Sequence, residues 1–162
     1  MIQMNDRSAE LAESISAAAS VKRSLQVVGG SSKLFYGREP EGSVLAIGNH
    51  AGIIAYDPTE LVVTVRAGTR LSELVQALRN ERQILAFDPP LFSSLATIGG
   101  TVACGLSGPS RPYRGAVRDS VLGVGLINGR GEQLRFGGQV IKNVAGYDCL
   151  LYTSPSPRDG LL

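Results

Sequence analysis

The chain contains two stretches in which apolar residues recur at the spacing of an α-helix. The first stretch follows candidate N-cap residues at Asn5, Asp6 and Ser8, and its apolar positions are Leu11, Ile15 and either Ala18 or Ala19. The second opens after Gly68 and Thr69 and carries Leu71, Leu74, Val75 and Leu78 at i, i+3, i+4 and i+7. We therefore expect two amphipathic helices, the first ending before Lys22.

Short runs of β-branched and aliphatic residues predict strands between and after these helices. The strongest run is LVVTVRA at 61–67, and the weaker ones lie at 25–29, 44–47, 53–56, 121–127 and 132–136. The last two runs are joined by NGRG at 128–131, which is a hairpin signal. Because strands and helices mix without a regular βαβ alternation, the pattern favours an α+β fold.

Residues 97–115 differ from the rest, because they are rich in glycine and show little periodicity. The whole chain has 20 glycines in 162 residues, which exceeds the usual share of about 7%. Such an excess is typical of a fold whose backbone must turn sharply or approach a ligand closely.

Composition excludes several classes of function. The net charge is +2 with no basic run, and Trp is absent, so the chain does not have the features of a nucleic-acid-binding protein. Two cysteines form neither a disulfide framework nor a CxxC metal motif. No apolar run reaches the ~20 residues that span a bilayer, and the N-terminus does not resemble a signal peptide. A cytoplasmic protein, possibly attached to a membrane through partner subunits, is the expectation.

The first candidate binding segment follows the strand at 25–29 and consists of Gly29, Gly30, Ser31, Ser32 and Lys33. Successive backbone N–H groups in a loop of small residues can surround a phosphate, because no Cβ blocks the approach. The loop matches neither the P-loop pattern nor the Rossmann pattern. A tight surface turn is the alternative interpretation.

The second candidate segment carries Thr97, Gly99, Gly100 and Thr101, and it continues through Gly105, Ser107 and Gly108. Its glycines allow close approach, and its hydroxyls are possible donors. Two such loops, far apart in the sequence, suggest two walls of one elongated cleft.

Several ordered motifs make the interpretation more specific. They are GGSSK followed by FYG, AYDPTELVVTVRAGT, DPP, TIGGTVACGLSGPSRPYRGAVRDSVLG and LRFGGQVIKNVAGYD. In this order they resemble the FAD-binding domain of the vanillyl-alcohol oxidase/p-cresol methylhydroxylase superfamily, and within it the FAD-binding subunits of glycolate oxidases. The resemblance extends from about Leu11 to Asp148.

The resemblance implies two α+β subdomains with FAD between them. Gly29 to Lys33 would bind the pyrophosphate, while Pro89 and the segment 97–101 would line the flavin and ribityl region, with Gly105, Ser107 and Gly108 continuing that wall. Some members attach FAD covalently through a His in the first loop. Ser32 stands at that place, so non-covalent FAD is expected.

Four other residues have a structural and a functional interpretation. Arg118 and Asp119 are either a salt bridge or cap, or a cofactor contact. Cys104 is expected to pack as a small buried residue rather than to attach flavin. His50, the one histidine, has no companions for a metal site and is expected to be a loop residue. No catalytic residue and no metal ligand can be named.

By resemblance, the expected function is oxidation of glycolate to glyoxylate, in a complex with a second flavoprotein subunit and an iron–sulfur subunit. A structural or electron-relay subunit without its own substrate site is one alternative. A standalone FAD-dependent 2-hydroxyacid or alcohol oxidoreductase is the other.

The end of the chain departs from the family pattern. The FAD-binding domain is expected over residues 1–149, with its second subdomain incomplete, and residues 150–162 are expected to be unrelated sequence. KNVAGYD at 142–148 is interpreted as mainly structural. We expect a chain interrupted in this way to bind FAD weakly or not at all.

Overall fold

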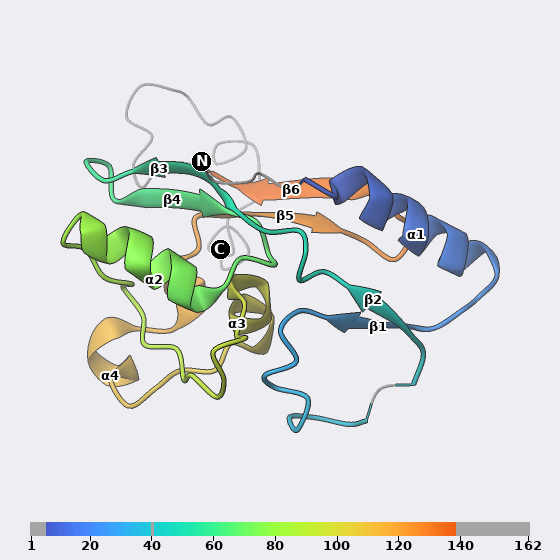
Figure 1. Cartoon of the computed structure of the whole chain (residues 1–162), viewed down its shortest axis with the longest axis horizontal. Coiled ribbons are helices and arrows are strands. Elements are labelled where there is room, and N and C mark those ends of the chain that lie inside the picture. The colour runs from blue at the N-terminus through green and yellow to red at the C-terminus, as the bar shows by residue number, and fades with distance from the viewer. Residues whose placement is uncertain (1–5, 40, 139–162) are drawn as a thin grey trace, which may run out of the picture.

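The chain folds into helices that pack beside three short β-ladders in the part that the structure describes (Figure 1). This structure is a computed structural model, and it describes residues 6–39 and 41–138. The α+β class expected from the sequence is confirmed.

The elements follow the predicted order. The helices are α1 (Ser8–Ser20), α2 (Leu71–Asn80), α3 (Ile98–Cys104), the single turn α4 (Arg111–Arg114) and the 3-10 turn η1 (Val117–Ser120). The strands are β1 (Leu25–Val28), β2 (Ser43–Ala46), β3 (Ile53–Asp57), β4 (Val62–Val65), β5 (Gly123–Ile127) and β6 (Gln133–Gly137). None of the helices in the described residues is long and apolar enough to cross a bilayer.

The strands β1 and β2 pair in parallel, with Leu25 opposite Ser43 and Val28 opposite Ala46. Parallel strands usually need a helical crossover, but the described part of this connection, residues 29–39 and 41–42, contains no helix. The first glycine loop therefore leaves the carboxyl end of β1.

The other two ladders are antiparallel hairpins. Asp57 accepts hydrogen bonds through Oδ1 from the amides of Thr59 (3.0 Å) and Glu60 (3.1 Å), which closes the turn between β3 and β4. In the β5–β6 turn, Asn128 Oδ1 accepts from the amide of Arg130 at 2.9 Å. The turn between β5 and β6 lies where the NGRG signal at 128–131 predicted it.

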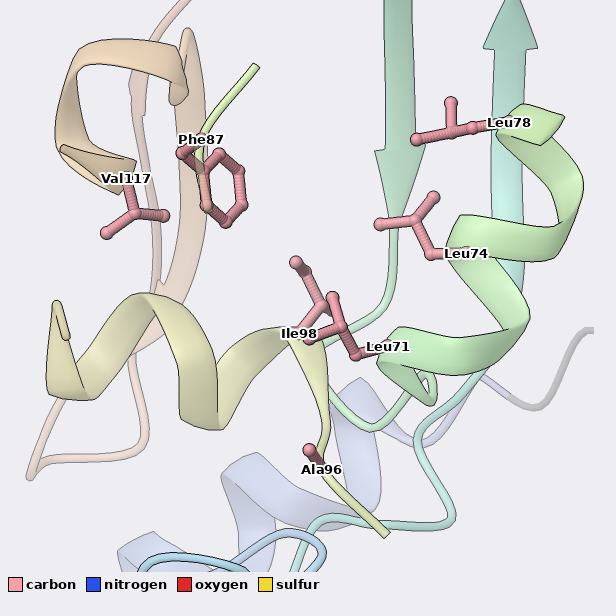
Figure 2. Close-up of a cluster of buried hydrophobic side chains, with 7 residues drawn as sticks. All are labelled: Leu71, Leu74, Leu78, Phe87, Ala96, Ile98 and Val117. Carbon is pink, nitrogen blue, oxygen red and sulfur yellow. The ribbon is translucent and has the colours of Figure 1, made fainter. Parts of the chain in front are cut away.

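The main apolar core lies between α2, α3 and η1 (Figure 2). Its members come from five parts of the chain and are Leu71, Leu74, Leu78, Phe87, Ala96, Ile98 and Val117. The predicted stripe of α2 is confirmed at three positions, because Leu71, Leu74 and Leu78 are all buried. Val63 and Val65 of β4 pack against the same cluster.

Residues 97–115, in which the low periodicity predicted no particular element, contain α3 in their first part. Two glycines in the first turn weaken the helical propensity of IGGTVAC. The helix forms because Thr97 Oγ1 caps it at the amide of Gly100 (3.3 Å) and because Ile98 and Thr101 are buried. Gly105 ends the helix in the left-handed region, with φ of 61°.

The sequence predictions for residues 139–162 concern the KNVAGYD segment and the unrelated tail. These residues lie outside the part of the chain that the structure describes.

Candidate functional site

The two glycine loops that the sequence predicted separately lie against each other. A Cβ at Gly29 would come 2.6 Å from Thr97 Oγ1, and a Cβ at Gly30 would fall on the carbonyl oxygen of Leu95. Both positions therefore require glycine for the packing of one loop on the other. The structure brings the segments 29–30 and 95–97 together as adjacent walls.

The first loop presents backbone donors. Ser31 has φ of 57°, a left-handed conformation that turns the chain within the loop. Within the described residues, the amides from Gly30 to Lys33 donate no hydrogen bond to a protein acceptor. Alternation of right- and left-handed backbone can aim successive N–H groups at one anion. The loop therefore has unused donors suited to a phosphate.

The second loop contributes close backbone approach and not free donors, because its hydroxyls serve α3 and the amides of residues 98–101 donate within the protein. Thr97 Oγ1 caps the helix, and the buried Thr101 donates through Oγ1 to the carbonyl of Thr97 at 2.9 Å. Gly99 donates its N–H to the Ala67 carbonyl at 2.8 Å, and a Cβ at Gly99 would come 2.7 Å from Ala67 Cβ. Gly99 thus allows α3 to begin directly on the turn after β4.

A carboxylate connects the predicted Pro89 segment to the predicted Gly108 segment. Asp88 accepts the Gly108 amide at its carbonyl (2.6 Å), and its Oδ2 accepts the Ser110 hydroxyl (2.5 Å). These hydrogen bonds from Ser110 hold the pKa of Asp88 below its usual range. Asp88 therefore holds the adjacent Pro89 near Gly108.

An aromatic pair spans the two walls at their exposed side. The ring centroids of Phe35 and Phe92 are 5.0 Å apart, with an interplanar angle of 77°. Phe35 is 67% exposed and Phe92 is 50% exposed, so the pair packs with little other cover. Edge-to-face pairs of this kind are favourable beyond their buried area.

Sequence reasoning did not identify Leu95, Phe92, Asp88 or Ser110 as parts of this site. The signal for Phe35 was present in FYG, which was quoted only as part of a motif. Nothing local could have indicated the link from Asp88 to Ser110, because these residues are separated by 22 positions and meet only through the fold.

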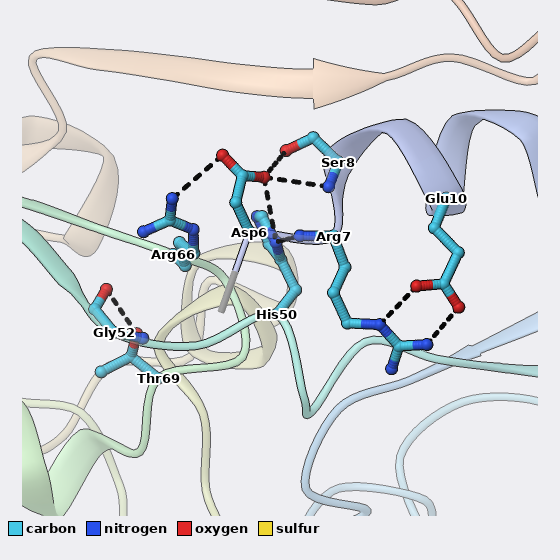
Figure 3. Close-up of polar contacts among 8 residues, drawn as sticks. All are labelled: Asp6, Arg7, Ser8, Glu10, His50, Gly52, Arg66 and Thr69. Atoms are coloured by element: carbon cyan, nitrogen blue, oxygen red, sulfur yellow. Dashed lines mark hydrogen bonds and ion pairs between the residues drawn. The ribbon is translucent and has the colours of Figure 1, made fainter. Parts of the chain in front are cut away.

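A separate polar cluster lies at the start of α1 (Figure 3). Asp6 pairs with the buried Arg66 at 3.0 Å and accepts the Ser8 amide at 3.0 Å, and these contacts lower the Asp6 pKa strongly. His50 Nδ1 accepts the Arg7 amide at 3.1 Å, and burial lowers the pKa of His50. The cluster attaches the N-terminal segment to the turn after β4.

The remaining candidates have structural contacts. Asp119 Oδ2 accepts the Ala116 amide at 2.8 Å, which caps η1, and Arg118 Nε lies 3.7 Å from Asp119 Oδ1. Cys104 ends α3 and is half-buried. Among the described residues, no group of three His, Cys, Asp or Glu side chains could hold a metal ion. The two loops are therefore suited to binding an elongated anionic ligand, chiefly through the backbone amides of the first loop.

Comparison with known proteins agrees with this chemistry. The family described as "FAD binding domain" matches residues 5–137. The chain is 50% identical over 148 residues to the glycolate oxidase subunit GlcE of Escherichia coli (strain K12). That alignment covers 91% of this chain and 42% of the relative, so the chain spans about two fifths of that protein's length.

Two further similarities are more distant. A D-lactate dehydrogenase of Anaerostipes hadrus is 30% identical over 109 residues, which cover 67% of this chain and 22% of that protein. The solved structure of Phl p 4.0202, a glucose dehydrogenase, superposes with a TM-score of 0.68 at 19% identity. It covers 80% of this chain and 27% of that one, and at this identity the likeness concerns the fold alone.

Proposed function

Since the chain belongs to the FAD binding domain family, we propose that its two glycine loops hold FAD as the non-covalent cofactor of a glycolate oxidase subunit. The intact protein would oxidise glycolate to glyoxylate.

The contact between the loops is the observation that carries this proposal. Gly29 and Gly30 pack on residues 95–97 without room for a Cβ, and the Gly30–Lys33 amides are free of protein acceptors in the described residues. A dinucleotide needs a donor-rich segment for its pyrophosphate and a continuous wall beside it. The residues present therefore fit the cofactor.

We assign the parts of the site as follows. The backbone from Gly29 to Lys33 binds the pyrophosphate, with Lys33 adding positive charge. Pro89 and the segment 97–101 line the flavin and ribityl region, and this wall continues through Gly105, Ser107 and Gly108. When bound, FAD supplies the acceptor for the two electrons of the oxidation, while the chain binds and orients it.

The attachment of FAD is proposed to be non-covalent. Ser32 stands in the first loop where some related flavoproteins carry a His that bonds to the flavin. A serine hydroxyl does not form that bond. Denaturation in acid followed by filtration should therefore release all the yellow colour from the holoprotein, whereas flavin retained by the precipitate would contradict the assignment.

The substrate and partners rest on the 50% identity to GlcE. A protein called a glycolate oxidase subunit implies other subunits, and we propose that these are a second flavoprotein and an iron–sulfur protein. We also propose that the FAD-binding domain covers residues 1–149 and that residues 150–162 lie outside it.

A second candidate function is supported by the D-lactate dehydrogenase similarity. In this alternative the flavin subunit acts alone on a larger 2-hydroxyacid. Anaerobic mixing of the FAD-loaded, full-length subunit with glycolate or with D-lactate separates the two. Bleaching of the flavin by D-lactate, but not by glycolate, would favour the alternative.

Cofactor binding itself is tested by titration. The chain should be extended to the length of its GlcE relative, and FAD binding followed by quenching of flavin fluorescence. We expect saturable binding near one FAD per chain, with much weaker binding by residues 1–162 alone. A long chain that purifies colourless and does not quench added FAD would overturn the proposal.

A further inference from the structure

The surface of α4 and η1 carries an excess of positive charge around an exposed tyrosine. We name Arg111, Tyr113, Arg114 and Arg118 the arginine surface. Tyr113 is 92% exposed and the Arg118 side chain 82% exposed. Arg111 and Arg114 are also exposed and lie three positions apart on one turn, so they share a face.

The positive charge of this surface is compensated only in part. Within residues 6–39 and 41–138, neither Arg111 nor Arg114 forms an ion pair, and Arg118 forms only the 3.7 Å contact with Asp119. Asp88 and Asp119 offset part of the charge, because Arg114 helps to lower the Asp88 pKa and Arg118 lies beside Asp119. Among the described residues, neither carboxylate accepts a hydrogen bond from one of these three arginines; their acceptor bonds come from Ser110 and Ala116. The guanidinium groups therefore have unused donors.

The segment that carries these groups is held in one conformation. The Arg114 amide donates to the backbone carbonyl of Ser110 (2.9 Å), and the Gly115 amide donates to that of Arg111 (2.9 Å). Pro112 lies in the first turn of α4. Ser110 is in turn fixed by its hydrogen bond to Asp88. A rigid surface loses less conformational entropy when it binds than a mobile one does.

We propose that the arginine surface is a docking site for an acidic segment of a partner protein. Arg and Tyr are the residue types enriched at protein interfaces and their energetic centres. The planar guanidinium also matches a carboxylate through two parallel hydrogen bonds. Charge complementarity therefore selects a partner surface rich in Asp and Glu.

A membrane or a nucleic acid fits this surface less well. An interfacial membrane element needs large apolar side chains beside its basic ones, and Tyr113 is the one large apolar side chain of residues 105–120 that is strongly exposed. A polybasic lipid site usually has 4–8 Lys or Arg residues, and this surface has three arginines. An extended nucleic-acid site would also need a longer basic stripe.

The proposed docking site adjoins one end of the proposed cofactor wall, since the Arg111 amide donates to the Gly108 carbonyl at 3.2 Å. Its three guanidinium side chains have no assigned part in holding the cofactor. In Figure 1, α4 lies on the far side of α3 from the loop that joins β1 and β2. FAD titration of the same variants therefore accompanies the peptide measurement. Weaker peptide binding with unchanged FAD binding assigns the effect to docking and not to the cofactor site.

The test uses the full chain and a fluorescent poly-glutamate peptide, with anisotropy as the measurement. We expect peptide affinity at low salt to fall on the order of tenfold in the triple variant Arg111→Glu, Arg114→Glu, Arg118→Glu. A matched triple variant, Arg79→Glu, Arg130→Glu, Arg135→Glu, changes the net charge equally at other exposed arginines and should bind nearly as the parent does. Equal weakening in both variants would overturn the proposal.

A charge-conserving variant keeps the test decisive if the reversal variant does not fold. Changing Arg111, Arg114 and Arg118 to lysine retains the charge but removes the bidentate geometry, so a smaller, measurable weakening is expected. Vesicles containing phosphatidylserine and a single-stranded oligothymidine serve as the other probes. Binding of either one through these arginines, without binding of the peptide, would overturn the proposal, as would a peptide that does not bind the parent.

Discussion

The backbone of Gly29 lies directly against the side chain of Thr97, so that a Cβ at position 29 would come 2.6 Å from Thr97 Oγ1. Thr97 is also the N-cap of α3. One side chain therefore joins the first glycine loop to the start of the second, and the two walls of the proposed FAD site are assembled before any ligand arrives. Such preorganisation lowers the cost of binding.

The two neighbouring glycines should respond differently to a methyl group. At Gly29 the added Cβ meets the Thr97 side chain, whereas at Gly30 it meets the backbone of Leu95, which has less freedom to move. Gly29→Ala should destabilise the chain by about 1–3 kcal/mol and Gly30→Ala by more than that. Urea unfolding of the two variants measures the difference.

A double variant separates packing from any general effect of alanine in the loop. Thr97→Ala removes Oγ1, so Gly29→Ala should cost less in that background than in the parent, while Gly30→Ala should cost the same in both. If Thr97→Ala does not reduce the cost at Gly29, the proposed contact is wrong.

The pair of Phe35 and Phe92 should contribute a coupling energy of about 0.5–1.5 kcal/mol to stability. The pair links the loop after β1 to the loop before α3 at a centroid separation of 5.0 Å. A double-mutant cycle with Phe35→Leu and Phe92→Leu, followed by urea unfolding, measures it. Leu91, which is 65% exposed, provides the control in a second cycle with Phe35→Leu and Leu91→Ala. A coupling energy between positions 35 and 91 as large as that between positions 35 and 92 would contradict the pairwise contact.

Local pattern was sufficient to predict the elements whose burial repeats along the chain. The stripe of α2 and the hairpin at 128–131 are examples, because period and turn chemistry both lie in adjacent residues. Helix α3 was missed because its stability comes from the Thr97 cap and from burial against distant segments, and both oppose the low propensity of Gly99 and Gly100. Periodicity does not reveal either cause.

The candidate site was predictable to a similar extent. The two loops could be identified from their small residues. The contact between them could not be predicted, because it depends on where the fold places β1 and α3. The interpretation of these glycines also changes, because Gly29, Gly30 and Gly99 are needed for packing within the protein. The sequence suggested sharp turns or close approach to a ligand as the reasons for these glycines, and it did not suggest packing of one loop on the other.

Removing the Ser110 hydroxyl should raise the pKa of Asp88 toward its ordinary value. The hydroxyl donates at 2.5 Å to Oδ2 and is the main cause of the lowered pKa. An NMR titration of the Asp88 carboxyl carbon in the parent and in Ser110→Ala measures the change. Ser107→Ala, which removes a hydroxyl three positions earlier that is not among the causes of the lowered Asp88 pKa, is the control. A Ser110→Ala variant whose Asp88 titrates as in the parent would show that the Ser110 hydroxyl is not what stabilises the carboxylate.

The protein should lose stability as the pH falls below about 6.5, because His50 is harder to protonate in the folded state than in the unfolded state. Burial is the main cause of its lowered pKa, and Nδ1 is already used to accept the Arg7 amide at 3.1 Å. The attraction of Asp6 opposes the shift without reversing it. The unfolded chain therefore binds the proton first, and the loss continues until the pH passes the lower folded pKa.

His50→Asn is the matched variant for this window, because Asn Oδ1 can accept the same amide and does not titrate. His50 is the one histidine of the chain, and Asp6, with its strongly lowered pKa, stays ionised in the folded protein throughout the window. Urea unfolding between about pH 7.5 and 5 should therefore show a decline in the parent that is much smaller in His50→Asn. A parent that gains stability on acidification would mean that attraction to Asp6 outweighs burial at His50.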